Sequence, residues 1–196
     1  IPHFHQYLLS EKGTEQLVLN IGGICNGTHL KDEEIIHSSD IGPGNCLLDA
    51  TMRNFNLGKF DSDGLMASKG NVDNILLEKL LHEIDFLSYP RADDLSLYLN
   101  LIETYKKSLA EKNPEDVLCT FVELTVRKIE EYFNFCGAPA KVIFHGGGSE
   151  NKYLMRRIKE TINTEISTIN SLISSKYVES AAFAYLAFKE RAVLFR

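Results

Sequence analysis

The chain has 196 residues, of which 44% are hydrophobic and 24% charged, a composition typical of a globular protein that buries a full core. Its formal net charge is −6 without a basic block, which argues against nucleic acid as a partner. No apolar run approaches the ~20 residues that span a bilayer, and no basic and apolar leader opens the chain. We therefore expect a cytoplasmic protein that binds neither nucleic acid nor a membrane.

The cysteines and histidines show no metal-binding or redox motif. Four cysteines lie far apart, so reduced and mostly buried thiols are expected, with two disulfides as the open alternative. The six histidines have no metal-ligand spacing, and surface or core positions explain them more simply. The opening segment Ile1-Pro2-His3-Phe4 has neither an initiator methionine nor a helix start. We expect the chain to be a piece of a larger protein or a processed one.

The first elements in chain order are strands. Short β-branched and apolar runs separated by tight turns predict an antiparallel meander. The predicted strands are 17–20, 25–30 and 34–38. A helix over 45–56 is expected next, because Leu47, Leu48 and Met52 fall on one of its faces. A loop rich in glycine and aspartate follows over 57–70.

Helices dominate the middle of the chain. The clearest spans 114–135, since Asn113 is a good N-cap, Pro114 suits the first helical position and Gly137 ends it. The other predicted elements are helices over 73–84 and 93–111, a strand over 141–145, a helix over 150–161, a strand over 165–170 and a helix over 178–193. This order predicts an α/β lobe with a mixed sheet, whose core (about 15–56 and 138–196) is interrupted by a helical insertion (about 57–137).

Three glycine turns are the most informative feature of the sequence. Two of them follow apolar strands directly, and the middle one follows a weaker strand. Glycine allows a sharp bend and lets a ligand approach backbone N–H groups, so three such turns suggest a surface for a phosphate-rich ligand. The turns are Asn20-Ile21-Gly22-Gly23-Ile24-Cys25-Asn26, Asp40-Ile41-Gly42-Pro43-Gly44-Asn45 and His145-Gly146-Gly147-Gly148-Ser149-Glu150-Asn151.

Each turn suggests a role in nucleotide binding. Gly22 and Gly23 offer N–H donors, while Asn20 and Asn26 can orient a water or a phosphate oxygen. Asp40 is expected to end its strand at the same edge, where its carboxylate could hold Mg²⁺ through water. Taken singly, the first motif is more often a plain hairpin, and Gly42-Pro43-Gly44 a plain turn.

The third turn is a moderately specific signal by itself. Gly146, Gly147 and Gly148 are expected to open a helix, where a base or ribose can lie against bare backbone. His145, which precedes them, has two interpretations: it packs near the base or, more simply, it is a core or strand-end histidine. The order and strand context of all three turns together favour a functional interpretation.

These motifs resemble the second lobe of the actin-like ATPase (ribonuclease H-like) superfamily, and more closely the C-terminal half of anhydro-N-acetylmuramic acid kinases. The matching segments cover nearly the whole chain. They are Leu19–Asn26, Asp40–Asn45 with Asp49, Phe60–Gly64 with Ala67 and Gly70, His145–Gly148 with Asn151, and Glu179–Ala184.

The resemblance implies an ATP- and Mg²⁺-dependent sugar kinase of cell-wall (peptidoglycan) recycling. Such an enzyme opens 1,6-anhydro-N-acetylmuramic acid with water and phosphorylates O6, giving N-acetylmuramic acid 6-phosphate. The implied β/γ-phosphate site is Asn20, Gly22, Gly23 and Asn26, flanked by Asp40, Gly42 and Gly44, and the implied adenosine site is Gly146, Gly147, Gly148 and Asn151.

Two departures from the family pattern keep alternatives open. The family's N-terminal lobe, with its phosphate loop and the aspartate that activates water, is absent, so no catalytic residue is assigned and the chain alone is expected to be inactive. Tyr89-Pro90-Arg91-Ala92-Asp93-Asp94 stands where the family has Pro-Lys-Ser-Thr-Gly on the sugar side. The alternatives are a degenerate scaffold or homodimerisation module, and a related kinase or ATPase with another acceptor.

Overall fold

Three antiparallel strands open the sheet in the computed structural model, which describes residues 1–85 and 88–189. They are β1 (Glu15–Ile21), β2 (Ile24–Lys31) and β3 (Glu34–Pro43). Two-residue turns join them, and the register pairs Asn20 with Asn26 and then Asn26 with Asp40. The predicted meander is confirmed.

Two further strands lie parallel to β1. These are β4 (Lys141–His145) and β5 (Glu165–Thr168), and the sheet order is β3-β2-β1-β4-β5. β1 is therefore central, and six of its seven residues are buried because both faces of the sheet are covered.

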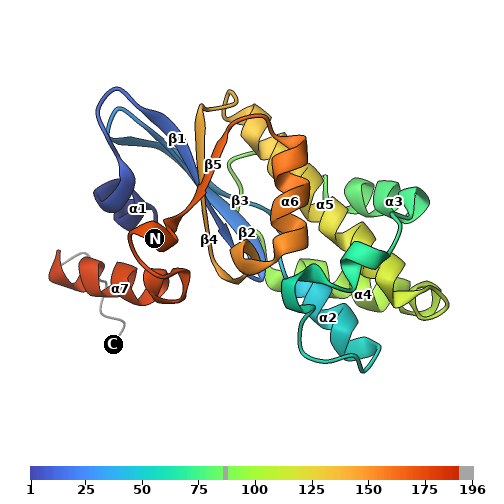
Figure 1. Cartoon of the computed structure of the whole chain (residues 1–196). Helices are drawn as coiled ribbons and strands as arrows, with labels where there is room; N and C mark the ends of the chain where they lie inside the picture. The colour runs from blue at the N-terminus through green and yellow to red at the C-terminus, as the bar shows by residue number, and fades with distance from the viewer. Residues whose placement is uncertain (86–87, 190–196) are drawn as a thin grey trace.

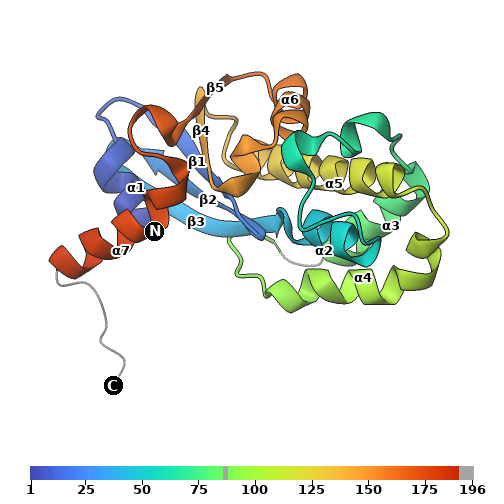
Figure 2. The same ribbon diagram turned by 60° about the horizontal axis from the view of Figure 1, so that its bottom comes forward.

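Helices cover the two faces unequally (Figures 1 and 2). The larger core joins Leu17, Leu19 and Phe144 to five helices, and the smaller core joins Ile143 to two. The five are α2 (Cys46–Asn54), α3 (Asn74–Ile84), α4 (Leu95–Ala110), α5 (Pro114–Phe135) and α6 (Lys152–Thr161), and the two are α1 (Pro2–Leu9) and α7 (Val178–Phe188).

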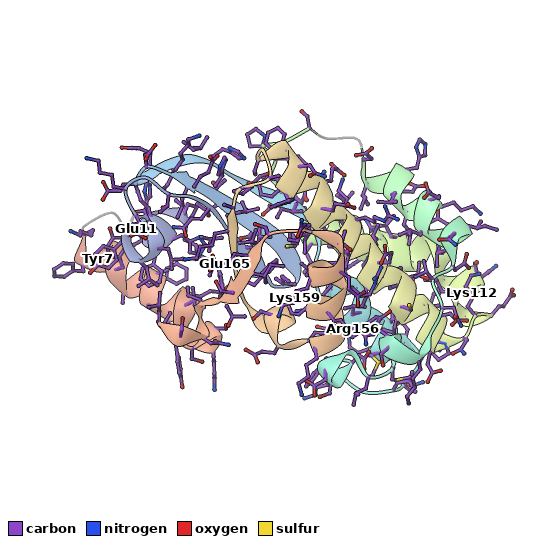
Figure 3. The ribbon with its side chains drawn as sticks, turned by 45° about the horizontal axis from the view of Figure 1, so that its top comes forward. Tyr7, Glu11, Lys112, Arg156, Lys159 and Glu165 are labelled. Atoms are coloured by element: carbon purple, nitrogen blue, oxygen red, sulfur yellow. The ribbon has the colours of Figure 1, made fainter. Side chains whose placement is uncertain are left out.

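α5 is the central helix of the larger core. Its predicted bounds are confirmed, and the Asn113 side chain accepts a hydrogen bond from the Glu115 N–H at its start. The helix packs so closely on β2 that a Cβ built on Gly27 would lie 2.4 Å from the Tyr132 ring. In front of α5, α6 directs Ile158 inward and leaves Arg156 and Lys159 exposed, as Figure 3 shows for the two labelled side chains.

Two expectations for the first half of the chain are wrong. The opening residues form α1, which begins at Pro2 in the first helical position and buries Phe4 and His5 against the sheet. The strand expected to stop at residue 38 continues to Pro43, because β2 offers it pairing partners as far as Ile24. Asp40 therefore lies within β3 and does not end it, and Gly42 belongs to the strand instead of a turn.

The second half differs in its element ends. The triple glycine leads into a 3₁₀ turn (Gly147–Glu150), and α6 begins only at Lys152, capped by the Asn151 side chain. β5 ends at Thr168, before the 3₁₀ turn Ile169–Ser171. The last helix is described to Phe188, and residues 190–193 of its predicted range lie outside the described residues.

All four cysteines are buried with free thiols, as expected for reduced cysteines. Within residues 1–85 and 88–189, no helix combines the length and apolar character needed to cross a membrane.

Candidate nucleotide site

The first two glycine turns are joined by backbone hydrogen bonds. The N–H groups of Gly44 and Asn45 donate to the carbonyl oxygens of Gly23 and Gly22, at 2.9 and 2.8 Å. A Cβ on Gly44 would lie 2.3 Å from the Gly22 carbonyl oxygen, so glycine is required for this approach. The tip of the β1–β2 hairpin is thereby fixed against the start of α2.

The third turn closes onto the same hairpin. A Cβ on Gly146 would lie 2.3 Å from the Asn20 side-chain oxygen, and one on Gly148 would lie 2.2 Å from Ile21. Gly146 also has φ +85°, a conformation that side chains disfavour. The three turns, distant in sequence, thus meet at one end of β1 and β4.

Gly147 differs from its two neighbours. It is exposed, and the nearest atom to a Cβ built there is the Asn45 side-chain nitrogen at 3.7 Å. Packing does not require glycine at this position. Open backbone at the rim of a pocket is what a ligand would need.

A pocket of about 360 Å³ opens beside Gly147. It lies between the first residues of α2, the 3₁₀ turn after β4 and a loop over 60–63. Its lining residues are Asn45, Leu48, Asp49, Phe60, Asp61, Ser62, Asp63, Gly147, Glu150 and Asn151.

Aspartate hydrogen bonds hold the loop beside the pocket in place. The buried Asp61 carboxylate accepts the N–H groups of Met66 and Ala67, at 3.0 and 2.9 Å. Asp63 pairs with Lys152 of α6 at 3.0 Å. Phe60, next to Asp61, is 64% exposed and offers an aromatic face at the pocket.

The polar residues of the first two motifs form a row across the sheet. Asn20, Asn26 and Asp40 are neighbours in register on β1, β2 and β3. His145 continues the row on β4, but its Nε2 faces His5 Nε2 at 3.0 Å, and its side chain is buried. His145 is thus a core residue, the simpler of its two interpretations.

The sequence matches a family model. The model described as anhydro-N-acetylmuramic acid kinase covers residues 1–194. The chain belongs to this family. A kinase of this name from Gamma-proteobacterium EBAC31A08 is 35% identical over 192 residues, which are 96% of this chain and 52% of that protein. The Haemophilus influenzae enzyme is 35% identical over 205 residues, covering 96% and 53%. The chain therefore spans about half the length of the curated family members it matches.

Solved structures show the fold. The activator of 2-hydroxyisocaproyl-CoA dehydratase from Clostridium difficile, with bound ADPNP, aligns with a TM-score of 0.56 and 12% identity, covering 100% of this chain and 69% of that one. Component A of (R)-2-hydroxyglutaryl-CoA dehydratase from Acidaminococcus fermentans aligns with a TM-score of 0.57 and 12% identity, covering 94% and 64%. The fold of this family member is that of the actin-like ATPases, as expected from the sequence.

The segment over 89–94 packs along β3. The Asp40 N–H donates to the Arg91 carbonyl oxygen, and the Asp93 N–H donates to the Asp40 carboxylate at 2.8 Å. Burial raises the pKa of Asp40, while the Asp93 N–H opposes that rise. One carboxylate oxygen of Asp40 is therefore already engaged within the protein.

Arg91 and Asp93 form a buried ion pair in the same segment. Arg91 Nε lies 3.2 Å from Asp93 Oδ1, and both side chains are at most 4% exposed. Arg91 also donates to the Ile41 carbonyl oxygen, and the Tyr98 hydroxyl donates to Asp93. The guanidinium of Arg91 is therefore directed into the protein.

Sequence reasoning missed part of the pocket. Asn45, Asp49 and Phe60 occur in the family-like segments, yet the sequence predicts no role for them, because only the fold brings the start of α2 to the loop over 60–63. Asn151 does line the pocket, but its side-chain oxygen accepts the Leu154 N–H at 3.0 Å and caps α6.

Proposed function

We propose that this chain is the nucleotide-binding lobe of an ATP-dependent sugar kinase. The enzyme converts 1,6-anhydro-N-acetylmuramic acid to N-acetylmuramic acid 6-phosphate, a step of peptidoglycan recycling in the cytoplasm. The observation that carries the proposal is the convergence of three glycine turns beside one pocket, with Gly147 left open. Membership of the kinase family supports the reaction, and the ADPNP-bound structural relative supports nucleotide binding.

The charges around the pocket orient the nucleotide. Four acidic residues line it, namely Asp49, Asp61, Asp63 and Glu150, so a triphosphate would be repelled there. Carboxylates and amides accept hydrogen bonds from ribose hydroxyls and from an adenine amino group. We place the adenosine in this pocket, against Gly147 and the exposed ring of Phe60.

The phosphates then extend toward the β1–β2 hairpin. Gly23 is exposed and Gly22 partly exposed, and the amides of Asn20 and Asn26 lie in the strands beside them. Gly42 and Gly44 are buried, so we assign them to the support of the hairpin. This divides the proposed site into phosphate-contacting and supporting glycines.

Asp40 fits Mg²⁺ only through an outer shell of water. One of its oxygens accepts the Asp93 N–H, and Mg²⁺ characteristically keeps several waters. When bound, the metal would neutralise charge on the transferred phosphoryl group. Asp40 would orient its waters, and Asn26, its neighbour in register, would hold a phosphate oxygen.

Phosphoryl transfer requires groups on both sides of the reacting phosphate. We therefore propose that a second lobe supplies the phosphate loop and the aspartate that activates water. The core (about 15–56 and 138–196) and the helical insertion (about 57–137) then act together as one C-terminal lobe. By itself this lobe would bind ATP without turnover.

Sugar-dependent release of ADP tests the reaction. The longest form of the protein that its gene encodes is assayed with ATP and Mg²⁺, with and without 1,6-anhydro-N-acetylmuramic acid. We expect ADP release only with the anhydro-sugar, and N-acetylmuramic acid 6-phosphate as the product. Absence of that product from an enzyme that binds ATP would overturn the proposed acceptor.

The ion pair between Arg91 and Asp93 favours a second candidate, a non-catalytic scaffold or dimerisation module. This internal contact lies where the resemblance leads us to expect polar groups on the sugar side, and it leaves the Arg91 charge directed away from a ligand. A protein that binds ATP but turns over neither the anhydro-sugar nor another acceptor would support this candidate. Its mass in solution would then show whether it forms a homodimer.

A further inference from the structure

A second cluster of chemically reactive side chains lies away from the nucleotide pocket. It brings together His29 of β2, His37 of β3 and Cys136 at the C-terminal end of α5. One ligand atom of each lies within 4.8 Å of the other two. His29 and His37 are partners in register, so the strand pairing fixes one next to the other. The sequence distance of about a hundred residues explains why no metal motif is visible.

His29 of this cluster has a buried ring nitrogen with no hydrogen-bond partner. The residue is only 5% exposed, and its Nδ1 is unpaired. Its other nitrogen, Nε2, lies 2.9 Å from the Glu15 carboxylate, which also pairs with Lys31. An unpaired buried ring nitrogen costs free energy unless something binds it.

Tyr132 packs beside this cluster, one helical turn before Cys136, and its buried hydroxyl interacts with the Cys136 thiol. The rings of His37 and Tyr132 lie edge to face with centroids 5.8 Å apart. The unpaired Nδ1 of His29, beside a thiol and a second imidazole, suggests a missing ligand.

The distance between two of the ligand atoms suits a tetrahedral zinc ion. Zinc takes sulfur at about 2.3 Å and nitrogen at about 2.0–2.1 Å, which places adjacent S and N ligands roughly 3.5 Å apart. Cys136 Sγ and His37 Nε2 are 3.6 Å apart. A hydrogen bond that His29 donates from its other nitrogen, Nε2, to the Glu15 carboxylate matches the carboxylate–histidine–zinc arrangement that fixes the imidazole tautomer.

We propose that His29 Nδ1, His37 Nε2 and Cys136 Sγ bind Zn²⁺. The fourth position is open to water, because His37 is only half-buried. The ion links β2, the edge strand β3 and the end of α5. His29 is three residues from Asn26 along β2, or about 10 Å, so the ion is separate from the proposed phosphate site.

Metal binding at this site would replace the thiol proton of Cys136 and would involve no redox step. Burial lowers the pKa of His37 and raises the pKa of Cys136 to about 12, so the metal-free imidazole is neutral and the thiol protonated. On binding, the Cys136 S–H bond breaks, the S–Zn bond forms and the proton passes to solvent. The charge of the metal stabilises the thiolate.

Cobalt spectroscopy tests the site without any assay of activity. The reduced protein, prepared without a histidine tag, is titrated with Co²⁺ and then with Zn²⁺. We expect intense d–d bands of tetrahedral Co²⁺ and a thiolate-to-cobalt charge-transfer band, both abolished by one equivalent of Zn²⁺. Absence of the charge-transfer band from the wild-type protein would overturn the proposal.

Variants identify the ligands. Cys136→Ser should abolish the charge-transfer band. Cys119→Ser should keep it, because Cys119 is a buried cysteine that is hydrogen-bonded to Tyr153 and lies outside the cluster. His37→Gln, at the half-buried position, should weaken Co²⁺ binding at least tenfold and serves if Cys136→Ser does not fold. Glu15→Gln should weaken it by roughly tenfold or more through His29. An unchanged band in Cys136→Ser, or its loss in Cys119→Ser alone, would contradict the assignment.

Discussion

At the scale of single residues, the three glycines after β4 have different reasons to be glycine. Gly146 and Gly148 are required by close packing against Asn20 and Ile21. Gly147 contacts nothing that would exclude a side chain and faces the pocket. The first two therefore serve the fold, and only the third is free to serve a ligand.

Alanine at Gly148 should destabilise the protein, whereas alanine at Gly147 should not. The Cβ of an alanine at position 148 would lie 2.2 Å from Ile21, so we expect Gly148→Ala to lower the free energy of unfolding by about 1–3 kcal/mol. Gly147→Ala should change it by no more than about 0.5 kcal/mol. Urea unfolding of both variants makes the comparison, and equal losses would show that the third turn is packed differently.

Aspartate at Gly147 should weaken ATP binding without unfolding the protein. A carboxylate there would occupy the space assigned to adenosine, in a pocket that is already acidic. We expect the dissociation constant for ATP·Mg²⁺ to rise at least roughly tenfold, or ~1.4 kcal/mol.

Gly13→Asp is the matched control for this substitution. Gly13 has open space around it and a positive φ that Asp tolerates, so it adds the same charge in a distant turn. Calorimetric titration should show unchanged affinity for this control. Equal affinity in Gly147→Asp and the wild type would count against the assigned pocket.

At the scale of elements, a buried pair of histidines holds α1 against the sheet. His5 Nε2 faces His145 Nε2, while His5 Nδ1 lies 3.0 Å from the Thr28 hydroxyl. Burial lowers the pKa of His5 to about 3 and of His145 to about 4, against 6.5 for free histidine. Both rings are neutral in the folded protein near neutral pH.

This pair should make stability depend on pH. Below about pH 6.5 these two histidines bind protons in the unfolded chain but not in the folded protein. The free energy of unfolding should therefore fall as the pH decreases toward 4. Urea midpoints between pH 7 and 5 would measure the slope. His5→Gln should flatten it, and His82→Gln, at an exposed residue of α3, should not. An equal slope in all three proteins would contradict the assignment.

The segment over 89–94 anchors the edge of β3 through its ion pair. Asp93→Ala removes the buried carboxylate that faces the Arg91 guanidinium, and we expect a loss of about 3–5 kcal/mol in stability. Asp94→Ala, which removes an exposed cap of α4, should cost less. Chemical denaturation would rank the two. A smaller loss for Asp93→Ala would mean that the pair is not the anchor.

At the scale of the molecule, local signals in the sequence predicted most elements. Asn113, Pro114 and Gly137 defined α5, and the β-branched run after residue 140 defined β4. The opening helix was missed although Pro2 is itself a helix-start signal. The length of β3 was missed because Gly42 and Pro43 have turn chemistry, and pairing with β2 overrides it.

The candidate sites were predictable to different degrees. The glycine turns can be recognised in the sequence because each consists of adjacent residues. The pocket wall formed by Asn45 and Phe60, and the cluster of His29, His37 and Cys136, depend on contacts between distant segments. A single sequence carries no signal for such contacts, whereas the fold supplies them.

The most direct test of the nucleotide site is an NMR titration of the ¹⁵N-labelled protein with ATP·Mg²⁺ up to millimolar concentrations, which detects weak binding to one lobe. We predict that the amide signals of Gly22, Gly23 and Gly147 shift together along one binding curve while that of Gly13 stays in place. Unmoved signals at all three glycines, or shifts confined to another face of the sheet, would contradict the account.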